Sequence, residues 1–86
     1  MSEAPRLRLY YRSGCGLCEE MQAELLAAQP RYGFDLEMVD VDSREALVAE
    51  YGHKVPVLTS SHLGHEEEIC HYFLDHSALE GYFSGG

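Results

Sequence analysis

Apolar and polar residues alternate in several stretches of the chain, with the period of half-buried strands. Leu7, Leu9 and Tyr11 alternate with arginines, and residues 34–41 continue the same pattern. An apolar run at 55–58 and a further alternating stretch at 69–73 have the length and residue types of strands. The pattern therefore predicts four strands, with a turn at residues 59–64 between the last two.

Residues 15 to about 29 repeat apolar side chains three and four positions apart, the period of an amphipathic helix. The apolar positions of this face are Cys18, Met21, Leu25 and Ala28. Pro30 lacks an amide hydrogen and crowds the preceding turn, so the helix is expected to end before it.

Two shorter helices are expected further along the chain. Asp42 and Glu45 have the acidic spacing of a capping box, and the apolar face that follows them ends at Gly52. Asp75 is expected to cap a last helix. The apolar residues of that helix are Ala78, Leu79, Tyr82 and Phe83.

The predicted order is β-α-β-α-β-β-α, without an internal repeat or linker. A strand-helix-strand start implies a right-handed parallel unit, and the short third connection implies an antiparallel hairpin. We expect one α/β domain over residues 1–86, with three helices on a four-stranded mixed sheet.

Composition and charge exclude several classes of protein. The 86 residues are 45% apolar and 24% charged, as in folded globular chains, and the net charge of −9 disfavours nucleic acid and anionic membranes as partners. No apolar run is long enough to span a membrane, and residues 1–6 lack the apolar core of a signal peptide. The expected protein is a cytoplasmic monomer.

The main chemical feature is the sequence Cys15-Gly16-Leu17-Cys18 at the junction of the first strand and helix. A thiolate at a helix start is stabilised by free amide hydrogens and the helix dipole, so we expect a lowered pKa for Cys15. Arg12 adds to this effect, whereas Glu19 and Glu20 oppose it. Cys18 shares the apolar face and is expected to resolve a mixed disulfide formed on Cys15.

Two other interpretations of the cysteines remain open. His62 and His65 form an H-x-x-H pair that could join Cys15 and Cys18 in a zinc set, although they fall in a predicted turn and no second C-x-x-C is present. The pair could also be structural, and Cys70 is expected to be a buried strand residue. A redox pair is the interpretation favoured by the position of the motif.

Together, several motifs resemble the short bacterial glutaredoxin-like proteins of the thioredoxin-fold superfamily. The resemblance extends from Leu7 to about Phe83. It is carried by Leu9-Tyr10-Tyr11, Cys15-Gly16-Leu17-Cys18, Val39-Asp40-Val41-Asp42, Tyr51-Gly52 and Val55-Pro56-Val57-Leu58.

The resemblance implies a thioredoxin-like fold and a cis Val55–Pro56 bond beside the cysteine pair, where the Val55 backbone would hold an extended substrate. It also implies thiol-disulfide exchange with Cys15 as nucleophile. Arg12 matches a basic residue near the glutathione carboxylate, and Asp75 supplies an acidic group at the last helix, although the glycine pair usual there is missing.

The predicted function is that of a thiol-disulfide oxidoreductase acting on protein disulfides or glutathione mixed disulfides. We expect no bound cofactor and no metal, with glutathione as a candidate reductant. The alternative is a non-enzymatic binding module that holds a metal through Cys15 and Cys18.

Overall fold

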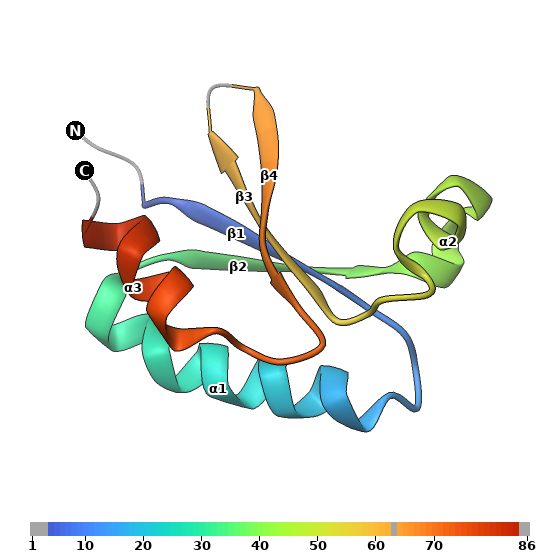
Figure 1. Cartoon of the computed structure of the whole chain (residues 1–86), viewed down its shortest axis with the longest axis horizontal. Coiled ribbons are helices and arrows are strands. Elements are labelled where there is room, and N and C mark those ends of the chain that lie inside the picture. Colours follow the sequence, from blue (N-terminus) through green and yellow to red (C-terminus); the bar gives the residue numbers. More distant parts are fainter. Residues whose placement is uncertain (1–3, 63, 85–86) are drawn as a thin grey trace.

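The computed structural model describes residues 4–62 and 64–84, and its elements follow the predicted order (Figure 1). A short 3-10 helix, η1, lies between β2 and α2. The elements are β1 (Arg6–Tyr11), α1 (Gly16–Tyr32), β2 (Asp35–Asp40), η1 (Val41–Ser43), α2 (Glu45–Tyr51), β3 (Val57–His62), β4 (His65–His71) and α3 (His76–Ser84).

The four strands form one mixed sheet in the order β2-β1-β3-β4. β1 is parallel to β2 and antiparallel to β3, and β3 is antiparallel to β4. Leu7 pairs with Leu36 of β2, and Leu9 pairs with Leu58 of β3. The predicted architecture of a parallel unit followed by a hairpin is confirmed.

Helices α1 and α3 lie on the same face of the sheet (Figure 1). The side chains that fill this core come from both layers and are almost inaccessible to water. They include Leu7, Leu9, Met21, Leu25, Leu58, Cys70 and Leu79. Burial of the α1 face confirms the helical pattern of the sequence and fixes α1 against the sheet.

Helix α1 does not end before Pro30, as the sequence predicted, but continues to Tyr32. Pro30 lies in the last turn, and the chain leaves the helix at Gly33 (φ 69°), whose amide donates to the Gln29 carbonyl at 2.7 Å. The Tyr32 ring stacks on Phe83 of α3, with centroids 4.7 Å apart. This packing compensates for the hydrogen bond that the proline cannot donate.

The predicted boundaries of β3 and β4 were also wrong. Residues 59–62 belong to β3 rather than to a turn, because Thr59 and Ser60 are buried between β1 and β4. Leu63 of the predicted turn lies outside the described residues. β4 ends at His71, since Tyr72 adopts a left-handed conformation (φ 66°) that no strand accommodates.

The two predicted helix caps had different outcomes. The Asp75 carboxylate accepts the Ala78 amide at 3.0 Å, which confirms it as the cap of α3. Asp42 is not the cap of α2: it lies within η1, and α2 begins after Arg44 without a side-chain cap. The capping-box prediction is therefore wrong, because the Asp42 carboxylate bonds Arg12 instead.

Among the described residues, no helix is both long enough and apolar enough to cross a membrane.

Candidate redox site

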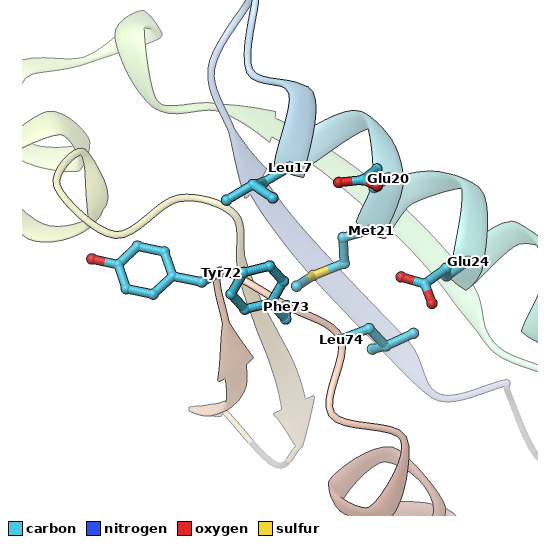
Figure 2. A pocket seen from close by; sticks show the side chains of 7 residues that line it. All are labelled: Leu17, Glu20, Met21, Glu24, Tyr72, Phe73 and Leu74. Atoms are coloured by element: carbon cyan, nitrogen blue, oxygen red, sulfur yellow. The ribbon is translucent and has the colours of Figure 1, made fainter.

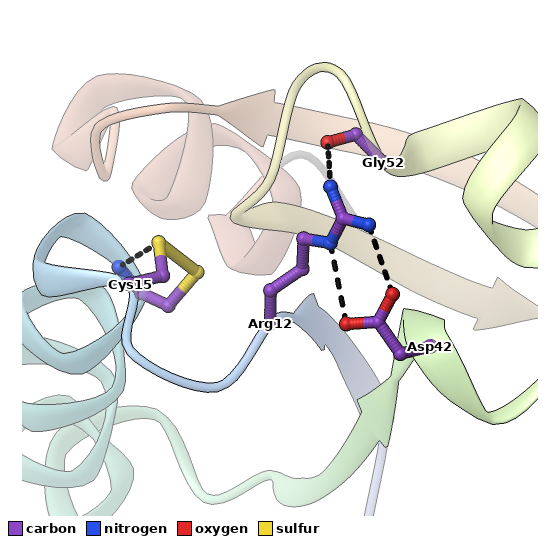
Figure 3. The surroundings of a disulfide bond; sticks show 5 residues. Arg12, Cys15, Asp42 and Gly52 are labelled. Carbon is purple, nitrogen blue, oxygen red and sulfur yellow. Dashed lines mark hydrogen bonds and ion pairs between the residues drawn. A yellow bond between two sulfur atoms is a disulfide. The ribbon is translucent and has the colours of Figure 1, made fainter.

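The cysteine pair lies where β1 leads into α1 (Figure 3). Gly14, with φ 75°, allows the loop to turn toward the helix. Cys15 is the N-cap residue of α1, and its sulfur accepts the Cys18 amide at 3.1 Å. Cys15 and Cys18 form a disulfide, with their Cα atoms 5.2 Å apart.

The two sulfur-bearing residues differ in access to water. Cys18 is 3% exposed and packs on the apolar side of α1, whereas Cys15 is only half-buried. A reaction partner therefore reaches Cys15 more easily than Cys18.

Arg12 lies close in sequence to the pair, but its guanidinium points to another partner (Figure 3). It donates to the Asp42 carboxylate at 2.9 Å and to the Gly52 carbonyl at 3.4 Å. The Arg12 hydrogen bond lowers the pKa of Asp42, and the same contact raises the pKa of Arg12. The charge of Arg12 is thus shared with a carboxylate and does not act on the cysteines alone.

Sequence reasoning missed Asp42 as the partner of Arg12. The signal that points to it is the parallel pairing of β1 and β2, whose carboxyl ends lie side by side. Arg12 follows one strand and Asp42 follows the other, so the two side chains meet although they are 30 residues apart.

The Val55–Pro56 peptide bond is cis, as the resemblance implied. Pro56 is buried, and its carbonyl accepts the Tyr72 amide at 2.9 Å. The Tyr72 hydroxyl donates to the His53 carbonyl at 3.1 Å. The loop before β3 is thereby tied to the connection between β4 and α3, a link that the sequence did not reveal.

Asp75 lies at the start of α3, where its carboxylate is already engaged as the helix cap. Cys70 lies in β4, and its side chain is buried in the core between the sheet and the helices α1 and α3. Burial raises the pKa of the Cys70 thiol, which keeps it protonated near neutral pH. The structure therefore places Cys70 as the packing residue that the sequence predicted.

In the alternative zinc set, Cys15 and Cys18 are joined to each other in a disulfide. Over residues 4–62 and 64–84, no group of three or more histidine, cysteine or acidic side chains is arranged to hold a metal ion. His65 is exposed at the start of β4, and the His62 side chain lies outside what the structure describes.

A groove of about 130 Å³ lies between α1 and the connection from β4 to α3 (Figure 2). Leu17, the residue before Cys18, lines it together with Met21 on the helix side. Phe73 and Leu74 line the opposite side. The sequence predicted Phe73 as a strand residue and gave no indication of this groove.

Comparisons with known proteins identify the family. A model of the glutaredoxin-like domain (DUF836) matches residues 6–84. The NMR structure of protein Ne2328 from Nitrosomonas europaea is 40% identical, with a TM-score of 0.84 over 98% of this chain and 96% of that one. Target protein XcR50 from X. campestris is 34% identical, with a TM-score of 0.64 over 93% and 97% of the two chains.

More distant structures show the fold alone. Mitochondrial thioredoxin 3 from Saccharomyces cerevisiae, in its oxidised form, is 20% identical, with a TM-score of 0.72 over 99% of this chain and 81% of that one. No curated protein sequence gives a significant match. With the family model covering nearly the whole chain and the disulfide at the start of α1, the protein belongs to the glutaredoxin-like (DUF836) family of the thioredoxin-fold superfamily.

Proposed function

We propose that the protein is a thiol-disulfide oxidoreductase whose reduced Cys15 and Cys18 transfer two electrons to a protein disulfide or a glutathione mixed disulfide. The observation that carries this proposal is the asymmetry of the pair. Cys15 is accessible at the helix start, and Cys18 is buried one turn into the helix within bonding distance of it.

The reaction has two exchange steps. The Cys15 thiolate attacks one sulfur of the substrate disulfide, forms a mixed disulfide, and releases the other sulfur as a thiolate. Cys18 then loses its proton and attacks the Cys15 sulfur, which forms the Cys15–Cys18 disulfide and releases the second substrate thiolate. The substrate gains two electrons, and the protein must be reduced again by an external thiol, for which we propose glutathione.

The helix start supports the attacking sulfur. The Cys18 amide donates to the Cys15 sulfur at 3.1 Å, and the first turn of α1 directs the positive end of its dipole toward the same atom. A thiolate gains more from this hydrogen bond than a thiol does, so the geometry favours the reactive form of Cys15.

We assign the docking of substrate to the loop before β3. Val55 is half-buried and Pro56 is buried, and we propose that the Val55 backbone pairs with an extended substrate segment as an added strand would. We also propose Arg12 and Asp75 as binding groups for the carboxylates and amino group of glutathione. Both side chains are engaged within the protein, so either one must share or exchange its partner to bind.

The test of the proposed function is Cys18→Ser, mixed with oxidised glutathione and followed by intact-mass measurement. This variant should accumulate one glutathione adduct on Cys15, because no second thiol is positioned to release it. The reduced wild-type protein should instead end as the intramolecular disulfide. Cys70→Ser is the matched control and should behave as wild type, since burial keeps Cys70 protonated.

A Cys18→Ser protein that forms no adduct, or that forms it on Cys70, would disprove the assigned roles. Reduction of the oxidised protein by glutathione, compared with reduction by a thioredoxin reductase system, then identifies the reductant. Faster reduction by the reductase system would exclude glutathione as the main electron donor.

The role of Arg12 has a separate test in Asp42→Asn. Removing the carboxylate leaves the Arg12 charge uncompensated, so the thiolate of Cys15 should be stabilised. In Asp42→Asn, we expect iodoacetamide to alkylate Cys15 about twofold faster than in the wild-type protein at pH 6.5 and low salt. The difference between the two proteins should be smaller at high salt. An unchanged rate would show that Arg12 has no influence on Cys15.

A further inference from the structure

The groove between α1 and the β4–α3 connection has an apolar floor (Figure 2). Met21 and Leu74 form this floor and are 1% and 8% exposed. Leu17, which lines one end of the groove, lies in the first turn of α1, the helix that Cys15 caps. A segment bound at this end lies against the same helical turn as Cys15.

Two large side chains at the edge of this groove, both in the connection between β4 and α3, are exposed. Phe73 is 68% exposed and Tyr72 is 41% exposed. They do not stand alone, because they continue the apolar lining formed by Leu17, Met21 and Leu74 at the surface of the molecule. Phe73 can therefore supply apolar contact area to a bound segment.

The conformation of the connection is fixed before any partner binds. Tyr72 adopts a left-handed conformation (φ 66°), which is unfavourable for a residue with a Cβ atom. Its amide is bonded to Pro56 and its hydroxyl to His53, and the Phe73 amide donates to the His71 carbonyl at 2.8 Å. Because these contacts hold the backbone of Tyr72 and Phe73 in place, binding at the groove requires little further ordering of the main chain.

The groove also carries negative charge. Glu20 and Glu24 are exposed along its helix side, and among its described lining residues there is no lysine or arginine. The Glu24 carboxylate lies 3.1 Å from His76 Nε2, and Glu20 adds a second carboxylate one helical turn earlier. Such a surface attracts a cationic segment.

We propose that this groove docks an extended segment of a protein substrate in which a large apolar side chain lies next to lysine or arginine. The apolar side chain contacts Phe73 and Leu17, and the basic residues face Glu20 and Glu24. This proposal rests on the proposed function, since it names the class of disulfide that Cys15 attacks.

The test compares two synthetic peptides of equal length. Each contains phenylalanine and a cysteine in mixed disulfide with 2-mercaptoethanol, and they differ only in carrying two lysines or two glutamates. Rates of reduction by the reduced protein are normalised to the disulfide of 2-mercaptoethanol alone. We expect the lysine peptide to react about tenfold faster than the glutamate peptide at low salt.

Matched variants separate local charge from net charge. Glu20→Gln with Glu24→Gln should lower the normalised rate of the lysine peptide about fivefold. Glu50→Gln with Glu67→Gln removes the same charge from exposed positions elsewhere and should change the rate less than twofold. Phe73→Ala should lower the rates of both peptides about tenfold, whereas Leu26→Ala, which truncates a side chain 50% exposed on the same helix α1, should have no effect.

Equal effects of the two double variants would overturn the proposal, as would an unchanged rate for Phe73→Ala. A protein that fails to reduce even the small neutral disulfide would instead disprove the proposed function. Docking is then tested alone by titrating a serine version of the lysine peptide and following amide shifts by NMR. Shifts centred on Leu17 and Phe73 would support the groove, and their absence would overturn it.

Discussion

The two faces of the sheet are stabilised in different ways. On the face covered by α1 and α3, the strands contribute Leu7, Leu9 and Leu58, which are fully buried. On the opposite face, β1 contributes Arg8 and Tyr10 instead. Helix α2 lies toward one end of the sheet and leaves much of this second face uncovered (Figure 1).

Polar contacts replace the missing helix layer on the second face. Glu66 of β4 accepts hydrogen bonds from the Tyr10 hydroxyl and from Thr59, the latter at 2.6 Å. Arg8 bridges Glu66 at 3.3 Å and Glu37 of β2 at 3.1 Å. These contacts cross all four strands and provide partners for the hydroxyl groups of the buried residues Tyr10 and Thr59.

Tyr10 marks the boundary between the polar network and a small apolar cluster near α2. Its ring stacks on Tyr51, with centroids 4.0 Å apart, and Val41 and Val57 pack with the pair. Burial raises the pKa of Tyr10, so the hydroxyl remains a donor to Glu66. The comparison shows that apolar burial stabilises the face covered by α1 and α3, whereas the other face combines hydrogen bonds and ion pairs with a small apolar cluster under α2.

The largest expected effect is on the apolar face. Leu25→Ala removes a fully buried side chain of α1 and should lower the free energy of unfolding by about 3 kcal/mol, because a cavity is left in the core. Urea denaturation followed by circular dichroism measures this change. Leu26→Ala is the control on the same helix and should cost less than about 0.5 kcal/mol.

A smaller loss is expected on the polar face. Glu66→Ala removes the acceptor of Tyr10 and Thr59, and should lower the free energy of unfolding by about 1–2 kcal/mol. Glu67→Ala, at an exposed position next to it, should change stability by less than about 0.5 kcal/mol. If Glu66→Ala cost as much as Leu25→Ala, the proposed difference between the two faces would be wrong.

The difference between apolar burial and polar contacts also explains which parts of the fold could be predicted from the sequence. Alternation identified β1, and helical spacing identified the buried face of α1, because both patterns arise from apolar burial. β3 was predicted too short, since Thr59 and Ser60 are typical of turns and are buried only through their pairing with β1 and β4. A local pattern does not contain that information.

The candidate site likewise contains features that local sequence predicts and features that it does not. The position of Cys15 and Cys18 at a strand-helix junction was predicted from neighbouring residues alone. The contacts of Arg12 with Asp42, and of Tyr72 with Pro56, join residues far apart in the chain. The groove between α1 and the β4–α3 connection is lined by residues from both segments, so its existence follows only from the assembled fold.

The smallest predicted effect concerns an ion pair on the polar side of β4. The Lys54 ammonium lies 2.6 Å from Glu68, and this contact is the main reason why the pKa of Glu68 lies below its usual 4.5. Partial burial opposes the shift, and a hydrogen bond with His71 adds to it. A lowered pKa in the folded state stabilises the protein above the pKa of the unfolded chain, and this stabilisation is lost as the pH falls through the folded value.

Lys54→Met should therefore reduce stability by about 0.5 kcal/mol at pH 7 and low salt, and by a smaller amount at pH 2.5, because protonation of Glu68 removes the ion pair as the pH falls. The same substitution in a Glu68→Gln background is the control and should have little effect at either pH. Urea denaturation at the two pH values measures all four proteins. A loss that is equal at pH 7 and pH 2.5 would mean that Lys54 contributes through the packing of its methylene groups, and that charge pairing does not stabilise this edge of the polar face.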